Sequence, residues 1–399
     1  MLDMIESFPP SRAIALERLA AFAPKAGAAY AKTRNFDNGA GRHSNVSVLS
    51  PYLRAKLLDE ADVTRATLKH HSAQAAEKFL AEVFWRTYWK GWMELRPSVW
   101  LQYQSDINRL RNDVETQAGL RQRWEEACLG QTGIAPFDSW ARELVETGYL
   151  HNHARMWFAS IWIFTLELPW QLGADFFLRH LLDGDAAVNT LSWRWVAGIQ
   201  TRGKTYLADP GNIAKYTGGR FPDVPGLSRT AVPVDAPENP PAAMLAPCPP
   251  PVLSGRYGLL LHCDDVDGTR LAALGPDPAA LAYLEVSDGH TPWKMAPEVG
   301  LFRSAAAQST LPERRLNILA SAQELAAWAK SKDLDMILAP YAPVGPIRQV
   351  FDAYQNLEAT APLRLSRRSL DTAAWPEATK GFFPFRKHIP RFIDLIRRG

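Results

Sequence analysis

The stretch that decides the fold is residues 147–198, which read TGYLHNHARMWFASIWIFTLELPWQLGADFFLRHLLDGDAAVNTLSWRWVAG. It mixes acids, amides and an arginine with well-spaced tryptophans, so it is too polar for plain core and too aromatic for plain surface. Apolar residues recur at helical spacing over residues 150–164, which predicts a helix there. Asn152, Arg155 and Met156 lie three and four residues apart and therefore share one face of that helix.

A second group of polar residues follows downstream. Asp183 and Asp185 flank a glycine and predict a turn before another helix, because acids favour the N-terminal end of a helix. Asp185, Asn189 and Trp193 then recur at four-residue steps on one face. A buried Arg155 needs a carboxylate partner, which predicts a pair with Asp183 or Asp185. The pair is open to two interpretations: a structural link between two helices, or part of a functional site.

The order of these residues resembles the flavin-binding domain of the photolyase/cryptochrome family. TGYLHNHARM is similar to the family's TGWxHNxxRM segment, and LLDGDAAVNTLSWRW is similar to its LIDGDxAxNxxxWQW segment. Trp170 stands thirteen residues before Asp183, which is the family's spacing. The resemblance covers about residues 30–221, roughly half of the chain, and implies a helical FAD-binding domain there.

The resemblance also implies which side chains serve which purpose. It implies that FAD is bound by Tyr30, Ser47, Leu49, Ser50, Arg86, Asn152, Arg155, Asp183, Asp185 and Asn189. It implies that a pyrimidine dimer in DNA is bound by Glu82, Trp85, Asn152, Met156 and Trp195. The residues expected to carry the chemistry are Glu82, Asn189, Trp193 and Trp170. No metal is expected.

Two further segments carry the resemblance upstream. VSVLSPYL is similar to the family's phosphate-holding TSxLSPYL, but Val46 replaces a threonine and removes one hydroxyl. An ordinary helix start, with Ser50 as the N-cap and Pro51 in the first turn, fully explains those two residues and is the better interpretation of them taken alone. Tyr30 opens a polar stretch predicted as a loop over residues 30–47, and it matches the family only in spacing.

The predicted helix over residues 77–93 contains LAEVFWR, which is similar to the family's LxELxWR. The alternative is an aromatic core stripe with an exposed pair between Glu82 and Arg86. The family's outermost relay tryptophan has no counterpart, because Val114 and its neighbours are not aromatic. The candidates to replace this outermost relay tryptophan are Trp100, Tyr103 and Trp157. The connector over residues 96–138 is predicted to be charged and irregularly helical.

Composition sets the outer limits. The chain has 399 residues, 47% of them hydrophobic, and a formal net charge of +3, so nucleic-acid binding would need a local basic patch. Cys128, Cys248 and Cys263 show neither metal nor disulfide spacing, which suits a reducing compartment. No export signal and no run of eighteen apolar residues is evident, so we expect a cytoplasmic protein without a membrane span.

The predicted fold class is multidomain α and α/β. Residues 1–221 are expected to form the helical FAD-binding domain, residues 222–253 a proline-rich linker or strap, and residues 254–399 an α/β domain with a parallel sheet. The last part is similar in character to the family's antenna domain in a rearranged order, and an unrelated α/β module is the alternative. The basic, aromatic tail at 380–398 is predicted as a solvated terminal helix or a phosphate contact. A second chromophore and the oligomeric state stay open.

These residues favour repair of cyclobutane pyrimidine dimers in DNA. Asn189 supplies an amide, as photolyases have at the matching position, and an amide there suits a reduced flavin. Asn152 and Met156 stand where six-four photolyases carry histidines, which favours the cyclobutane lesion. The missing outer tryptophan and the unusual C-terminal part favour the alternative of a cryptochrome-like blue-light sensor, and a redox flavoprotein without a light role is a third interpretation.

Overall fold

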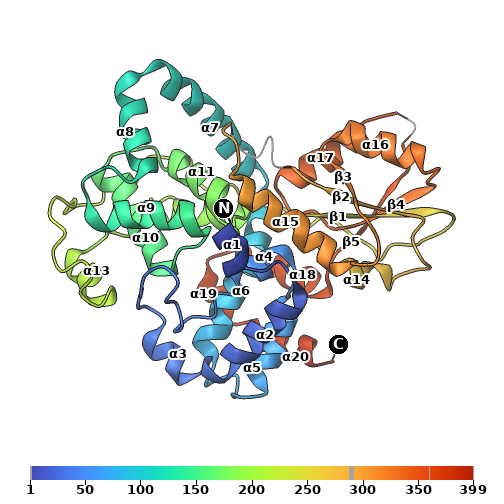
Figure 1. The fold of residues 1–399 in the computed structure, drawn as a ribbon, viewed down its shortest axis with the longest axis horizontal. Helices are drawn as coiled ribbons and strands as arrows, with labels where there is room; N and C mark the ends of the chain where they lie inside the picture. Colours follow the sequence, from blue (N-terminus) through green and yellow to red (C-terminus); the bar gives the residue numbers. More distant parts are fainter. Residues whose placement is uncertain (1, 287–291, 359, 399) are drawn as a thin grey trace.

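The computed structural model describes residues 2–286, 292–358 and 360–398, and a helical part lies beside an α/β part (Figure 1). The first helices of the helical part are α1 Leu2–Ser7, α2 Arg12–Phe22, α3 Ala28–Thr33, α4 Ser50–Ala55, α5 Glu60–Leu68, α6 Glu77–Glu94 and α7 Ser98–Thr116. It continues with α8 Ala118–Leu129, α9 Ala135–Thr147, α10 Asn152–Ser160, α11 Trp170–His180, α12 Ala186–Val196 and α13 Pro210–Tyr216. A short 3₁₀ turn, η1, spans Ala23–Lys25, and a π-helical turn, η2, spans Ile161–Thr165.

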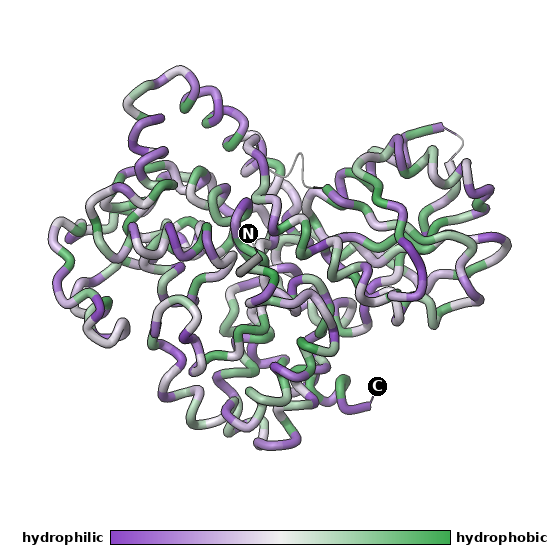
Figure 2. Tube along the Cα trace, viewed as in Figure 1, coloured by the Kyte–Doolittle hydropathy of each residue, from purple (hydrophilic) through white to green (hydrophobic). Residues whose placement is uncertain are grey.

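The α/β part is a parallel sheet with the strand order β3-β2-β1-β4-β5. Its strands are β1 Tyr257–His262, β2 Ala280–Leu284, β3 Asn317–Leu319, β4 Met336–Pro340 and β5 Leu363–Ser366. Its helices are α14 Gly268–Ala272, α15 Pro297–Thr310, α16 Ala322–Ser331 and α17 Pro346–Gln355. Every residue of β1, β2 and β4 is buried, which is why these strands read as continuous apolar runs (Figure 2). The predicted fold class and parallel sheet are confirmed.

The last thirty residues leave the α/β part and return to the helical part. They form α18 Ser369–Ala374, the 3₁₀ turn η3 Trp375–Glu377, α19 Phe382–Arg386 and α20 Ile389–Arg398, whose apolar residues belong to the core of the helical part. Gly91 permits the close approach of η3, because a Cβ there would lie 2.8 Å from the Cα of Trp375. The C-terminal helices pack against α5 and α6. The predicted domain boundaries at residues 221 and 253 stay a prediction.

Helix α6 lies at the centre of the helical part. Its apolar side chains recur three and four residues apart, as the sequence predicts, and most of its C-terminal half is buried. Helix α12 covers one side of α6, and η3 and α19 cover another. Arg86 and Lys90, one turn apart, therefore point toward α12, while Trp85 and Tyr88 contact the C-terminal helices.

The proline-rich residues 222–253 contain neither helix nor strand and lie along the helical part as an extended strap. The Val234 amide donates to the Ala197 carbonyl at 3.0 Å, and the Ala243 amide donates to the Leu95 carbonyl at 2.8 Å. Among the residues that the structure describes, no helix is both long enough and apolar enough to cross a membrane.

Several local predictions are wrong. Tyr30 lies in α3 and not in a loop, because its ring packs edge-on against Phe22 and Phe79. The connector at 96–138 is regular: α7 buries a stripe of apolar residues at helical spacing, which its many charged residues obscure in the sequence. Asp209 caps α13, with its carboxylate accepting from the Asn212 amide at 2.7 Å.

The helix predicted over residues 150–164 divides into α10 and the π-helical turn Ile161–Thr165. The expected N-cap of α4 is also displaced by one residue. Leu49 occupies the N-cap position without a side-chain hydrogen bond, and Ser50 is already helical. The Ser50 hydroxyl is thereby left for a longer-range contact.

Candidate functional site

The turn between α11 and α12 presents two buried carboxylates, Asp183 and Asp185. Asp185 is the N-cap of α12, and its Oδ1 accepts from the amides of Ala187 and Val188 at 3.1 and 3.0 Å. The predicted turn and helix start are therefore confirmed. Both carboxylates are buried, so each needs cationic partners to remain ionised.

Asp183 lies between two arginines. Arg155 Nη1 donates to its Oδ1 at 3.0 Å, as the sequence predicts, and Arg86 Nη2 lies 3.9 Å from its Oδ2. The Ser50 hydroxyl makes a further hydrogen bond to this carboxylate. Burial alone would raise the pKa of Asp183, but Arg155, Arg86 and Ser50 outweigh burial and hold the pKa below its usual range.

Asp185 has partners that the sequence analysis missed. Lys90 Nζ lies 3.1 Å, Arg54 Nε 3.7 Å and Arg86 Nη1 3.9 Å from Asp185 Oδ2. Burial raises the pKa of Asp185, and the three cations together with the α12 amides more than offset it, so the pKa lies well below its ordinary value. Lys90 lies one turn beyond Arg86 on α6, and this four-residue spacing is the signal by which the sequence could have revealed it.

We expect the loss of charge on Asp185 to destabilise the protein in acid. Because the folded-state pKa is depressed, the stabilisation is complete above the unfolded value near pH 4 and is lost as the pH falls toward the folded-state value. The free energy of unfolding, measured with urea between pH 3 and pH 7, should therefore decline below about pH 4. Asp185→Asn should lower stability at pH 7 and make that decline shallower.

Asp264 and Asp265 also have lowered pKa values, so the acid decline should weaken in Asp185→Asn without vanishing. The matched control is Asp113→Asn in the surface pair with Arg109, which should leave both the stability and its pH dependence nearly unchanged. An Asp185→Asn protein with the same pH dependence as the unchanged chain would contradict this prediction.

The loop before α4 and the Arg86 side chain of α6 each show one feature of a ligand-binding site. Val48 has a φ of 53°, in the left-handed region that β-branched residues rarely adopt, and it lies between the half-buried Ser47 and the buried Leu49. Arg86 Nη1 is buried without a hydrogen-bond partner among the described residues. It lies 3.9 Å from Asp185, which is too far for a hydrogen bond, so this guanidinium retains a donor for an anionic ligand.

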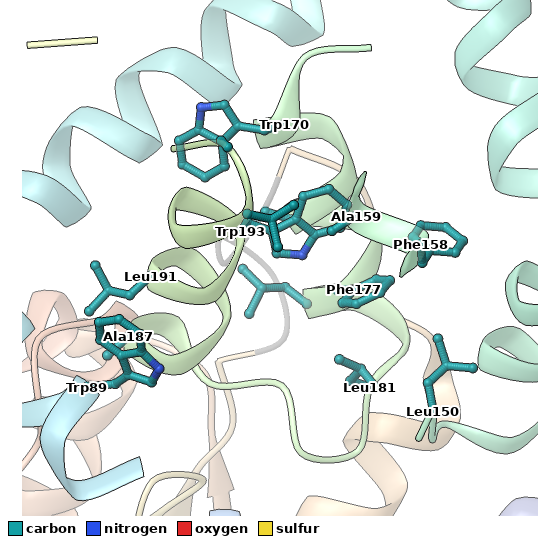
Figure 3. Packing of buried hydrophobic residues seen from close by; sticks show 14 of the residues in the cluster. Trp89, Leu150, Phe158, Ala159, Trp170, Phe177, Leu181, Ala187, Leu191 and Trp193 are labelled. Atoms are coloured by element: carbon teal, nitrogen blue, oxygen red, sulfur yellow. The ribbon is translucent and has the colours of Figure 1, made fainter. Parts of the chain in front are cut away.

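Asn189 lies one turn after Asp185 on the buried face of α12. Its Nδ2 donates to the Ala174 carbonyl at 2.8 Å, which fixes the orientation of the amide against α11. Trp193 follows one turn later, and its ring contacts Phe177 with centroids 5.1 Å apart (Figure 3). The predicted common face of Asp185, Asn189 and Trp193 is confirmed.

The aromatic residues beyond Trp170 separate the three candidates for the outer relay position. Tyr103 packs against Trp170 with ring centroids 5.8 Å apart, and Trp100 stacks on Tyr103 at 5.3 Å. Trp157 instead stacks on Trp140 at 5.4 Å. The ring contacts of Trp170 therefore run through Tyr103 to Trp100, and both of these residues are buried.

The residues expected to hold a substrate lie in two neighbouring groups. Both carboxylate oxygens of Glu82 are engaged, one by the Tyr30 hydroxyl and the other by Arg34. Tyr30 was expected to bind FAD, but its hydroxyl instead contacts the carboxylate of Glu82. The backbone carbonyl of Arg34 lies 3.0 Å from Nε2 of His151, the N-cap of α10, so Arg34 brings Glu82 close to the start of α10.

The exposed Asn152 begins α10, and its Nδ2 lies 3.8 Å from the Sδ of Met156 on the next turn. Trp195 is half-buried and stacks on Tyr206 with centroids 5.9 Å apart. Trp85 is also half-buried, and one of its faces is covered by Phe382 from the C-terminal segment. That contact joins residues almost three hundred positions apart and has no signal in the sequence pattern.

Comparison with known proteins shows what the helical part resembles. Residues 79–216 match the family model described as the FAD binding domain of DNA photolyase. The deoxyribodipyrimidine photo-lyase of Vibrio cholerae is 30% identical over 188 residues, which cover 45% of this chain and 37% of that protein. The corresponding protein of Thermus thermophilus is 32% identical over 204 residues, which cover 50% of this chain and 45% of that protein. The matched part is thus less than half the length of either relative.

Two solved structures show a similar but looser agreement. A class III photolyase from Agrobacterium tumefaciens is 26% identical with a TM-score of 0.46, and the match covers 54% of this chain and 44% of that one. A cryptochrome from Synechocystis is 26% identical with a TM-score of 0.43, covering 52% and 43%.

The helical part, with its paired carboxylates and spare arginine donor, is a flavoprotein domain that takes FAD as its cofactor. Through this domain the chain is similar to the DNA photolyases. The residues present suit that cofactor, because Arg86 and the strained Ser47–Ser50 loop offer donors to an anionic dinucleotide.

Proposed function

We propose that the protein repairs cyclobutane pyrimidine dimers in DNA with the energy of blue light. The observation that carries this proposal is the carboxyl group of Glu82, which Tyr30 and Arg34 hold beside the start of α10, where Asn152 is exposed. Burial raises the pKa of Glu82, so its carboxyl group can share a proton with a carbonyl oxygen of a pyrimidine base. Reduced FAD, when bound, supplies the electron that opens the cyclobutane ring.

In this proposal the chain's own residues bind and orient the cofactor and the lesion, and they exclude water. Arg86, Arg155 and Ser50 hold the cofactor side of the site, with Asp183 as their common anchor. Asn189 would present an amide of fixed orientation to the flavin ring. Trp85 and Trp195 would stack on the rings of a lesion turned out of the DNA duplex, while Asn152 and Met156 line the α10 side.

A cryptochrome-like blue-light sensor is the second candidate, favoured by the link between the two parts of the chain. Arg54 lies 3.7 Å from Asp185 in the helical part and 2.8 Å from Asp264 in the loop after β1. A change of charge near Asp185 would therefore be felt directly by the α/β part. The expected antenna-like character of the α/β part, and the cytoplasmic location, stay predictions.

We expect the reduced, FAD-loaded protein to repair a thymine dimer in an oligonucleotide under blue light. Glu82→Gln should slow repair about ten- to a hundredfold, because it removes a charge-assisted hydrogen bond worth about 1.5–3 kcal/mol. Asn189→Asp should also weaken repair, because it places a negative charge beside a reduced flavin. The measurement is the rate of dimer loss per absorbed photon on single- and double-stranded substrates.

Glu115→Gln is the matched control, because Glu115 lies on α7 with 64% of its side chain exposed. This variant should repair the dimer at the original rate. A protein that binds FAD and photoreduces it, yet repairs neither substrate, would overturn the repair proposal and leave the sensor as the better explanation.

A further inference from the structure

The C-terminal segment covers one aromatic face of Trp85, a residue on which the proposed repair reaction depends. The rings of Phe382 and Trp85 are nearly parallel, with an interplanar angle of 12° and centroids 3.6 Å apart. No other ring pair among the described residues has closer centroids. At this separation the two rings are in van der Waals contact, so nothing else can stack on that face of Trp85.

The segment that carries Phe382 is held through its backbone before that residue and by the fully buried ring of Phe385 after it. The Tyr88 hydroxyl donates to the Lys380 carbonyl at 2.9 Å, and Arg96 Nη2 donates to the Thr379 carbonyl at 2.7 Å. Gly381 follows, where an added Cβ would meet no atom within 4 Å. Phe382 itself is buried, whereas the next residue, Phe383, is 74% exposed. The segment is thus anchored on both sides of Phe382, the side chain it inserts.

We propose that Phe382 competes with the substrate for Trp85 and thereby sets which DNA can enter the site. This inference rests on the proposed repair function, in which a pyrimidine ring stacks on Trp85. A single flat face accepts one ring at a time, so binding of a lesion requires Phe382 to move away. Phe382 is therefore a specificity-determining residue, because only a ligand with enough further contacts displaces it.

Basic side chains of this segment could contact DNA once the segment is displaced. Lys380 and Lys387 flank α19 and are exposed, and Arg386 pairs with Glu77 on the surface of α6. If the segment moves to admit a lesion, these cations move with it. DNA phosphates would attract them and partly offset the loss of the aromatic contact.

The test is the dark affinity of the FAD-loaded protein for two oligonucleotides, one with a thymine dimer and one without, measured by fluorescence anisotropy at fixed salt. Phe382→Ala should bind the dimer-containing strand about tenfold more tightly, because an aromatic pair is worth up to roughly a tenfold change in affinity. Phe383→Ala is the matched control in the same segment and should bind like the unchanged protein.

Phe382→Leu guards against a simple failure to fold, because leucine retains much of the buried volume but offers no flat ring. It should bind more tightly than the unchanged protein, as Phe382→Ala does. Equal binding of the dimer by the unchanged chain and by both variants would overturn the competition while leaving the repair proposal in place. Failure of every form to bind the dimer better than the undamaged strand would overturn the repair proposal and the competition together.

Discussion

Arg54→Ala is expected to lower the free energy of unfolding by about 3–5 kcal/mol, because it leaves a buried charge without its partner. Only 3% of the Arg54 side chain is exposed, and its guanidinium pairs with Asp264 at 2.8 Å. The same group donates to the carbonyl oxygens of Gly184 and Cys263 at 2.8 and 2.6 Å. Its removal thus leaves a carboxylate and two carbonyls in the interior with fewer donors. Urea denaturation at pH 7 measures the effect.

The control for Arg54→Ala is Arg109→Ala, which removes an arginine from a surface pair and should change the free energy of unfolding by less than about 1 kcal/mol. Hydrogen exchange gives a second measurement. Because Arg54 joins the turn before α12 to the loop after β1, its removal should speed exchange at Val266, whose amide donates to the Ala55 carbonyl. A loss below about 1 kcal/mol for Arg54→Ala would show that the contact contributes little.

Gly173→Ala is expected to lower the free energy of unfolding by about 3 kcal/mol, at the upper end of the usual effect of overpacking. A Cβ on Gly173 would lie 2.3 Å from Cη2 and 2.6 Å from Cζ3 of Trp193, and 3.0 Å from Trp162. Trp193 is only 2% exposed, so its ring has little room to move. The substitution should also displace Trp193 from Phe177, which near-ultraviolet circular dichroism would detect.

Gly119→Ala is the matched control, since Gly119 lies within α8 and an added Cβ there meets no atom within 4 Å. In open space a helical alanine is more favourable than glycine, so Gly119→Ala should raise the free energy of unfolding by about 0.5–1 kcal/mol. A destabilisation by Gly173→Ala no greater than about 0.5 kcal/mol would mean that Trp193 can be accommodated elsewhere.

The parts of the site that the sequence predicted are those governed by local periodicity. Asp185 as a helix cap, the shared face of Asn189 and Trp193, and the pairing of Arg155 with Asp183 all follow from spacing along one or two helices. The parallel sheet within residues 254–399 was likewise predicted. Such features depend on a few neighbouring residues, so one sequence contains the information.

The parts that the sequence did not predict depend on contacts between distant segments. Arg54 pairs with Asp185, but nothing in its local sequence pattern identifies that partner. The alternative pair between Glu82 and Arg86 does not form, and the Glu82 carboxylate engages Tyr30 and Arg34. Which of several cations reaches a given carboxylate is decided by how the helices pack, and that depends on the whole fold.

The return of the C-terminal helices to α6 has a consequence for biosynthesis. During synthesis, α6 emerges from the ribosome long before Trp375 and Phe382 are added to the chain. These two residues cover α6 in the folded protein. Until then Gly91 and its apolar neighbours lack their partners, and the nascent chain carries an uncovered hydrophobic surface. The helical domain therefore completes its folding only after the α/β part has been synthesised, and a stop codon after residue 368 should yield a chain that depends on chaperones.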